Sequence, residues 1–292
     1  MQLLSFAAMA SECKIYLDVS DEVETSLVAK QVEDEVLRIQ NKFSRYRPDS
    51  VVSQINALAG SSAYSCDAET ASLFNFAHQL HAQFDGVFDI TTGVLRRAWD
   101  FSAQVLPSND AVQALLPLVG WHQVLWDGQH IHLPCAGMEI DLGGLGKEYA
   151  VDRAANLLMQ AGFKSALINF GGDVFAVGPK HDGAPWEVGI QHPRRPGHLI
   201  AVLPLKLGGM ATSGDYERFM VVDGVRYSHL LNPITGWPVQ HWQAISVLAP
   251  SCMLAGALSS AFMLSGERAL SLLKSSGLRA LCVNHASEVH SF

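Results

Sequence analysis

The sequence predicts an α+β fold, with one domain of mixed helices and strands over residues 1–292. The chain has 292 residues, 49% of them hydrophobic, so it can bury a large core. Apolar runs with strand and helix periods follow one another without strict alternation, which favours α+β over a doubly wound sheet. No linker or internal repeat divides the chain, which indicates a single domain.

The first half of the chain is predicted to be mainly helical after an opening strand. The apolar opening MQLLSFAAMASEC lacks a basic start and is short for a secretory leader, so we interpret it as a strand. Asp67 is placed to cap a helix, and Pro107-Ser108-Asn109-Asp110 opens a short one. Two apolar stripes at helical spacing are Val28, Val32, Val36, Ile39 and Phe43, then Leu73, Ala77, Leu80 and Phe84.

The second half is predicted to be richer in strands. Asp-Gly lies between apolar runs at 127–128 and at 223–224, which predicts two tight hairpins. An apolar strand is expected to end at Asp141, before a helix that starts near Lys147. Further strands are expected in SALINF, VFAVG, WEVGIQ, LIAVLPLKL, AISVLA and RALCVN, and helices at 252–264 and near 267–275.

Charge and cysteine usage narrow the class of protein. The net charge is −8, from 20 basic and 28 acidic residues, and no lysine or arginine run forms a basic face. This argues against a nucleic-acid partner. Five cysteines are scattered without a C-x-x-C pair, which is typical of reduced thiols. We expect no transmembrane segment, because the apolar stretch MLAGALSSAFML is too short to span a bilayer, and a cytoplasmic location, or a periplasmic one if a leader has been removed.

The segment DLGGLGKEYAVDRAANLL, residues 141–158, has the layout of an anion site at a helix start. Its glycines let a ligand approach the backbone, and the helix start offers N–H groups and a positive dipole end. Lys147 adds a cation. The spacing matches neither the mononucleotide P-loop nor the dinucleotide G-x-G-x-x-G pattern. Taken alone, the segment is equally consistent with a structural glycine-rich corner.

Four other segments share this composition of glycine, aspartate and small hydroxyl residues. Polar turns of this kind line binding sites more often than they fill cores. The segments are GVFDITTGVL (86–95), INFGGDVFAVG (168–178), ATSGDYERF (211–219) and YSHLLNPITGWPV (227–239).

With these motifs the chain resembles the FAD:protein FMN transferases, the ApbE family, from about Met9 to Gly266. FSRYRPDSVVSQIN is similar to the family's Phe-Ser-x-Tyr segment and FDITTGVL to its Phe-Asp-x-Thr-x-Gly turn. DLGGLGKEYAVD is similar to the family's Asp-Leu-Gly-Gly-Ile-Ala-Lys-Gly-Tyr-Ala-Val-Asp. ALINFGGD, ATSGDYER and YSHLLNPITGWPV match its remaining motifs.

The resemblance implies a transferase that moves the FMN half of its substrate FAD to a Ser or Thr hydroxyl of an acceptor flavoprotein, with release of AMP. It also implies Mg²⁺ as a cofactor, with the Gly144 carbonyl and Ser260 among its ligands. Thr212, Ser213 and Gly214 would lie beside the flavin or the acceptor path. The residues implied to contact FAD are Met9, Tyr46, Val87, Phe88, Asp89, Asp141, Lys147 and Leu231.

The chain departs from the family at the metal site. Where the family has Ala-Asp-Ala-Leu-x-Thr on a helix, this chain has AGALSS, so Gly256 replaces an aspartate and Ser260 a threonine. Glu148 stands where the family usually has glycine. Three interpretations remain open: a weakened but working metal site, a replacement ligand such as Glu148, or a protein that binds FAD without transferring FMN.

His229 is the candidate proton acceptor, because its ordinary pKa lies near neutrality and its motif is expected beside the diphosphate. Asp215 and Asp173 are alternatives. Two other functions stay open besides transfer, a non-catalytic FAD-binding protein and an FAD diphosphatase in which water replaces the acceptor hydroxyl.

Overall fold

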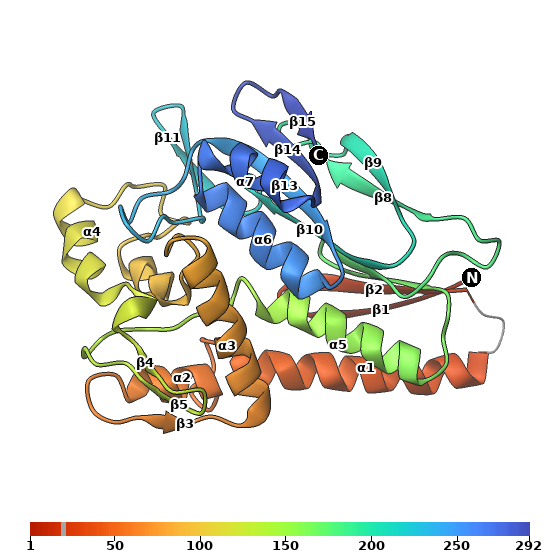
Figure 1. Ribbon diagram of the computed structural model, residues 1–292, viewed down its shortest axis with the longest axis horizontal. Helices are drawn as coiled ribbons and strands as arrows, with labels where there is room; N and C mark the ends of the chain where they lie inside the picture. The colour runs from red at the N-terminus through yellow and green to blue at the C-terminus, as the bar shows by residue number, and fades with distance from the viewer. Residues whose placement is uncertain (19–21) are drawn as a thin grey trace.

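The centre of the molecule is an eight-stranded sheet in which all neighbouring strands are antiparallel (Figure 1). The computed structural model describes residues 1–18 and 22–292. The strands lie in the order β1-β2-β6-β7-β10-β13-β14-β15. Their bounds are Gln2–Ala8, Ser11–Leu17, Ala166–Phe170, Asp173–Ala176, Gly208–Gly214, Trp242–Ala249, Arg279–Asn284 and Val289–Ser291.

Helices cover one face of this sheet and a hairpin covers the other. Three helices, α1 (Glu22–Phe43), α5 (Gly146–Gln160) and α6 (Cys252–Leu264), share one buried apolar cluster with the strands, and α7 (Arg268–Ser276) follows α6. A second cluster joins the opposite face to β8 (Trp186–Gln191) and β9 (Leu199–Leu205). This layering of helices and antiparallel strands confirms the predicted α+β class.

The remaining elements lie outside the central sheet and its covering layers, and α2 and α3 are drawn near the carboxyl end of α1 (Figure 1). Their helices are α2 (Val51–Ala57), α3 (Ala68–Gln83), η1 (Ile90–Arg97), α4 (Asn109–Leu115), η2 (Leu116–Leu118) and η3 (Trp121–Gln123). Their strands are β3 (Tyr64–Ser65), β4 (Leu125–Trp126), β5 (His130–His132), β11 (Phe219–Val222) and β12 (Val225–Ser228).

Most predicted elements are present. The two apolar stripes are buried on α1 and at α3, and Asp67 caps α3 by accepting a hydrogen bond from the Thr70 amide at 2.8 Å. Ser108 caps α4, and both Asp-Gly hairpins form. Helix α6 spans the predicted residues 252–264.

Two predictions about strands are wrong. The opening segment is a hairpin of β1 and β2 rather than one strand, with Met9 and Ala10 at φ +51° and +56° in its turn. The strand expected before Asp141 does not form. Instead, the side-chain amide of Asn56 accepts from the Ile140 amide at 2.7 Å and donates to the Ile140 carbonyl at 3.0 Å. This side chain satisfies the backbone groups that a neighbouring strand would otherwise bond.

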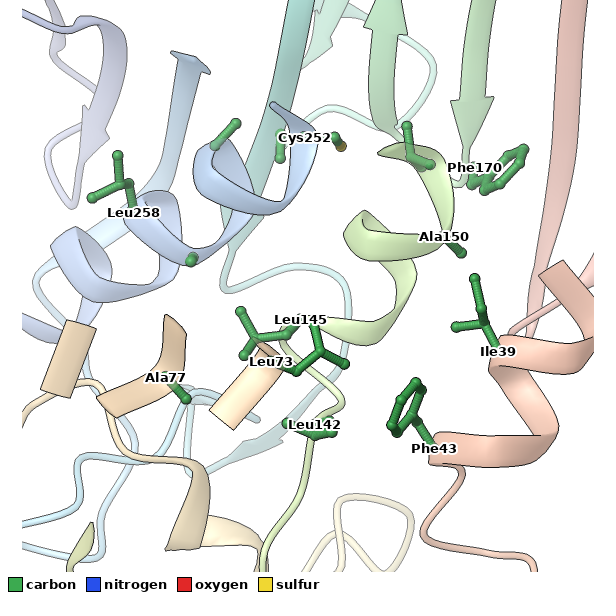
Figure 2. Close-up of a cluster of buried hydrophobic side chains, with 14 of the residues drawn as sticks. Ile39, Phe43, Leu73, Ala77, Leu142, Leu145, Ala150, Phe170, Cys252 and Leu258 are labelled. Carbon is green, nitrogen blue, oxygen red and sulfur yellow. The ribbon is translucent and has the colours of Figure 1, made fainter. Parts of the chain in front are cut away.

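The core fixes the position of the glycine-rich corner. Leu142 and Leu145 flank Gly143 and Gly144, and both leucine side chains are buried. Figure 2 shows them pointing into the apolar cluster between α1, α3 and α6. The corner is therefore anchored by its leucines, while its glycines stay free of the core.

Two further observations bear on the class of protein. All five cysteines are free thiols, as predicted for a reduced set. None of the helices in the described parts of the chain is long and apolar enough to cross a membrane.

Candidate functional site

A cavity of about 540 Å³ lies where the glycine-rich corner, η1, β10 and the segment after β12 meet. This volume falls in the range of small-molecule sites. The predicted site residues that line it are Phe88, Asp89, Asp141, Gly144, Lys147, Thr212, Ser213, Gly214, His229, Leu231 and Ser260. Segments up to about 170 residues apart in the sequence therefore meet at one place.

A second cavity, of about 520 Å³, also adjoins the glycine-rich corner. It is lined by residues of the β1–β2 turn, the end of α1 and the segment that follows, including Met9 and Tyr46. Arg96, Asp141, Gly143 and Lys147 line both cavities. The corner is therefore a wall shared by the two cavities.

The glycine-rich corner has backbone groups that are free to bind a ligand. Asp141 orders it, because its carboxylate accepts from the Gly143 amide at 2.8 Å and its own amide bonds the Ile90 carbonyl. Among the described residues, no side chain caps the start of α5, and no atom outside the adjacent residues lies within 4 Å of where a β-carbon of Gly144 would be. An uncapped helix start with open backbone is suited to bind an anion.

Three basic side chains lie at the glycine-rich corner, although the chain is acidic overall. Arg45 donates to an Asp141 carboxylate oxygen at 3.0 Å, and Arg96 lies 3.5 Å from the same oxygen. Lys147 Nζ lies 2.8 Å from Asp173 Oδ2. Burial acts to lower the pKa of Lys147, but the carboxylates of Asp173 and Glu148 raise it above its ordinary value, so the ammonium group stays charged.

Glu148 is a buried acid at the edge of the first cavity. It is 8% exposed and lines the cavity, and its Oε2 atom has no hydrogen-bond partner among the residues that the structure describes. Burial and the neighbouring carboxylate of Asp173 raise the pKa of Glu148 to about 8. Burial also raises the pKa of Asp173. Two acids with raised pKa values beside one lysine are typical of a functional site.

Hydroxyl groups from β10 and α6 form one wall of the cavity. Ser213 Oγ lies 2.8 Å from Ser260 Oγ and 2.7 Å from Ser259 Oγ. Thr212 is bonded to Ser246 on β13 at 2.8 Å. These contacts place Ser260 on the cavity side of α6, as its predicted role requires.

His229 also lines the first cavity and is half-buried. Its Nδ1 atom is 3.2 Å from the Arg218 carbonyl, which can only accept, so Nδ1 carries the proton and Nε2 is free to accept one. Burial lowers the pKa of His229 to about 4. The imidazole is therefore neutral at pH 7, the state that a proton acceptor needs.

Comparison with known proteins identifies the family. The ApbE family profile matches residues 9–282, nearly the whole chain. The chain belongs to the ApbE family. An FAD:protein FMN transferase of Treponema pallidum is 32% identical over 252 residues, which cover 80% of this chain and 70% of that protein. The FAD:protein FMN transferase of Escherichia coli is 28% identical, with 91% and 77% covered.

Solved ApbE structures have the same fold. The ApbE protein of Thermotoga maritima is 31% identical, with a TM-score of 0.90 over 99% of this chain and 96% of that chain. The flavinyl transferase ApbE of Pseudomonas stutzeri, in its apo form, is 30% identical, with a TM-score of 0.84 over 99% and 94%. The predicted family and its fold are confirmed.

Three predicted contact residues of this ApbE protein lie outside the first cavity. Met9 and Tyr46 line the second one, and Tyr46 accepts a hydrogen bond from Arg96 at 3.0 Å. Val87 lines neither cavity. Asp89 lines the first cavity, but its carboxylate caps η1 through Thr91 and accepts from the Trp121 amide. The Asp89 carboxylate is therefore already engaged by two backbone amides of the protein.

The two alternative proton acceptors, Asp215 and Asp173, both form ion pairs. Asp215 forms a bidentate ion pair with Arg194, at 2.7 and 2.6 Å, and lies outside the cavity. Asp173 lines the cavity but pairs with Lys147.

Two basic residues at the site, Arg45 and Arg96, were not predicted from the sequence. Their positions in FSRYR and VLRRAW, next to two motifs, were a usable signal.

Proposed function

We propose that this protein is an FAD:protein FMN transferase, which moves the FMN half of FAD to a Ser or Thr hydroxyl of an acceptor flavoprotein and releases AMP. One observation carries the proposal. The glycine-rich corner, with Lys147 and Arg96, is shared by two cavities of about 540 and 520 Å³. A dinucleotide has the matching form, with two ring systems joined by an anionic diphosphate.

Each part of the dinucleotide has a chemical counterpart in the site. The diphosphate is bound by the backbone of the corner and by the ammonium of Lys147. The first cavity is lined by Thr212, Ser213, His229 and Ser260, so we assign the flavin half of FAD, which reacts, to this cavity. The adenosine half then lies beside Tyr46, whose ring is suited to stack on a base. The relatives named FAD:protein FMN transferase support FAD as the substrate.

The transfer requires a proton acceptor and a leaving group. The acceptor oxygen forms a bond to the FMN phosphorus as the bond from that phosphorus to the bridging oxygen breaks, and AMP leaves with that oxygen. Nε2 of His229 takes the hydroxyl proton, because Nδ1 is committed to the Arg218 carbonyl. Lys147 neutralises charge on the diphosphate throughout.

The oxygen donors around the first cavity fit a Mg²⁺ ion. Gly144 and Ser260 line the cavity, and Glu148 has an unpartnered buried oxygen there. No group of three or more His, Cys, Asp or Glu side chains in the described residues is arranged to hold a metal. Hydroxyl, carbonyl and phosphate oxygens would therefore complete the coordination, which is usual for Mg²⁺. When bound, the ion neutralises charge on the diphosphate.

The test is incubation with FAD, Mg²⁺ and a threonine-bearing acceptor protein. We expect flavin fluorescence that stays with the acceptor after denaturation, a mass increase equal to FMN less water, and AMP in solution. An acceptor with that threonine changed to alanine is the matched control and should remain unlabelled. Free FMN with AMP would instead indicate a diphosphatase, and intact bound FAD a binding protein, so either result would overturn the proposal.

A further inference from the structure

Glu148 is placed differently from Asp141 and Asp173, two other acids that line the first cavity. Asp141 is bonded by Arg45 and the Gly143 amide, and Asp173 is paired with Lys147. Glu148 is 8% exposed, and no hydrogen bond from any described residue reaches its Oε2 atom. A buried carboxylate oxygen without a partner is costly unless a ligand satisfies it.

Gly256 on α6 is the reason that this side chain fits. A β-carbon at position 256 would lie 2.6 Å from Glu148 Cγ and 2.8 Å from Glu148 Oε1. Such distances are far shorter than van der Waals contact, so any other residue at position 256 would displace the glutamate. The carboxylate of Glu148, which comes from α5, thus occupies space beside α6 that a side chain from α6 would otherwise fill.

The surroundings of Glu148 supply further oxygen donors. Ser260 lies four residues after Gly256 on α6, and its hydroxyl contacts Ser213 on β10. Ser260, Gly144 and Glu148 line the same cavity, and so does Asp173. Hydroxyl, carbonyl and carboxylate oxygens are the ligands that hard divalent cations prefer.

We propose that Glu148 supplies the protein carboxylate ligand of a divalent cation in this cavity, and that Gly256 is glycine because the ligand now comes from α5. This inference rests on the proposed function, since the substrate diphosphate provides the remaining negative charge. The carboxylate ligand that the family resemblance places at position 256 on α6 would then come from Glu148, 108 positions earlier in the chain. The cation site then keeps one protein carboxylate, supplied by α5 in place of α6.

The test measures metal binding without turnover. Mn²⁺ replaces Mg²⁺, and the free ion is quantified by its paramagnetic resonance signal in the presence of protein saturated with FAD and no acceptor. We expect the Glu148→Gln variant to bind Mn²⁺ at least about tenfold more weakly, because even outer-shell partners of a metal contribute about 10–100-fold. FAD affinity without metal, followed by quenching of flavin fluorescence, should change less than about twofold.

Two further variants make the result specific. Glu187→Gln removes an exposed acid on β8, outside both cavities, and should leave Mn²⁺ binding unchanged. The double variant Glu148→Gly/Gly256→Asp moves the carboxylate from α5 to α6 and should recover most of the affinity that Glu148→Gly alone loses. A melting curve of each variant confirms that it is folded.

The outcomes separate this inference from the proposed function. If FAD binds and Glu148→Gln binds Mn²⁺ as tightly as the unmodified protein, the inference is overturned and the proposed function stands. If the double variant recovers nothing while it is folded and binds FAD, the exchange of position between α5 and α6 is refuted. If the unmodified protein does not bind FAD, the proposed function fails first.

Discussion

The ammonium group of Lys147 lies 2.8 Å from a carboxylate oxygen of Asp173, and the two residues come from different elements, α5 and β7. Asp173 is buried and Lys147 is partly exposed. The pair therefore holds a positive charge at the edge of the glycine-rich corner. It also ties the start of α5 to the central sheet.

This geometry predicts two separable effects of Lys147. Lys147→Met should weaken FAD binding about tenfold or more, because a charge-assisted contact to the diphosphate is lost. It should also lower the free energy of unfolding by about 1–3 kcal/mol, because Asp173 is left buried without its cation. Adding Asp173→Asn should restore stability but not FAD affinity. Fluorescence titration and urea denaturation measure the two effects, and recovery of both by the double variant would contradict the assignment.

The contact between Glu148 and Gly256 predicts that replacing this helical glycine by alanine lowers the free energy of unfolding, whereas such a change usually raises it. In a helix, glycine to alanine ordinarily stabilises by about 1 kcal/mol. Here the new methyl group would overlap Glu148, and overpacking costs about 1–3 kcal/mol, so Gly256→Ala should destabilise the protein. In a Glu148→Ala background the same change should be neutral or stabilising. Urea denaturation of the four proteins gives the coupling, and an additive result would refute the contact.

His229 should set the pH dependence of the transfer. Because burial lowers its pKa to about 4, the imidazole stays able to accept a proton well below pH 6.5. We expect kcat/KM to remain level from neutral pH down to about pH 5 and to fall below it. His229→Asn should reduce kcat by about 100-fold or more while leaving FAD affinity within a few-fold. A profile that falls near pH 6.5 would show that this histidine is not the acceptor.

Glu69 on α3 should contribute stability that depends on pH. Burial acts to raise its pKa, but hydrogen bonds from Arg38, Lys42 and Tyr149 lower it to about 2. A lowered pKa favours the folded state above the unfolded pKa of about 4.3, and this contribution is lost as pH falls towards 2.

Glu69→Gln should therefore lower the free energy of unfolding by about 1–2 kcal/mol at pH 7, since partial exposure screens these charges. The difference from the unmodified protein should shrink steadily below pH 4. Glu187→Gln, which removes an exposed acid on β8, serves as the control. Equal stability differences at pH 7 and pH 3 would rule out the ionic contribution.

Local signals in the sequence predicted much of the fold. The periodic stripe of α1, the Asp67 cap and the Asp-Gly turns each depend on neighbours within a few residues, and each is present. Strand β10 has the sequence GGMATSG, which lacks the branched apolar residues typical of strands. It forms because β7 and β13 pair with it on both sides. No local pattern could indicate this.

The site was predictable as a set of motifs but not as a geometry. The cavity brings together Lys147, Ser213, His229 and Ser260, all of which the motifs had singled out. The same motifs could not reveal that Asp89 is committed to capping η1. They also could not show that Asp173 pairs with Lys147, because Asp173 lies on β7 and Lys147 on α5. Assignment to one domain stays a prediction.

The close packing of Glu148 against Gly256 makes these two positions interdependent. A side chain at position 256 and a glutamate at position 148 would compete for one small volume between α5 and α6. The residue accepted at either position is therefore constrained by the residue at the other, and only paired exchanges can move bulk from one helix to its neighbour.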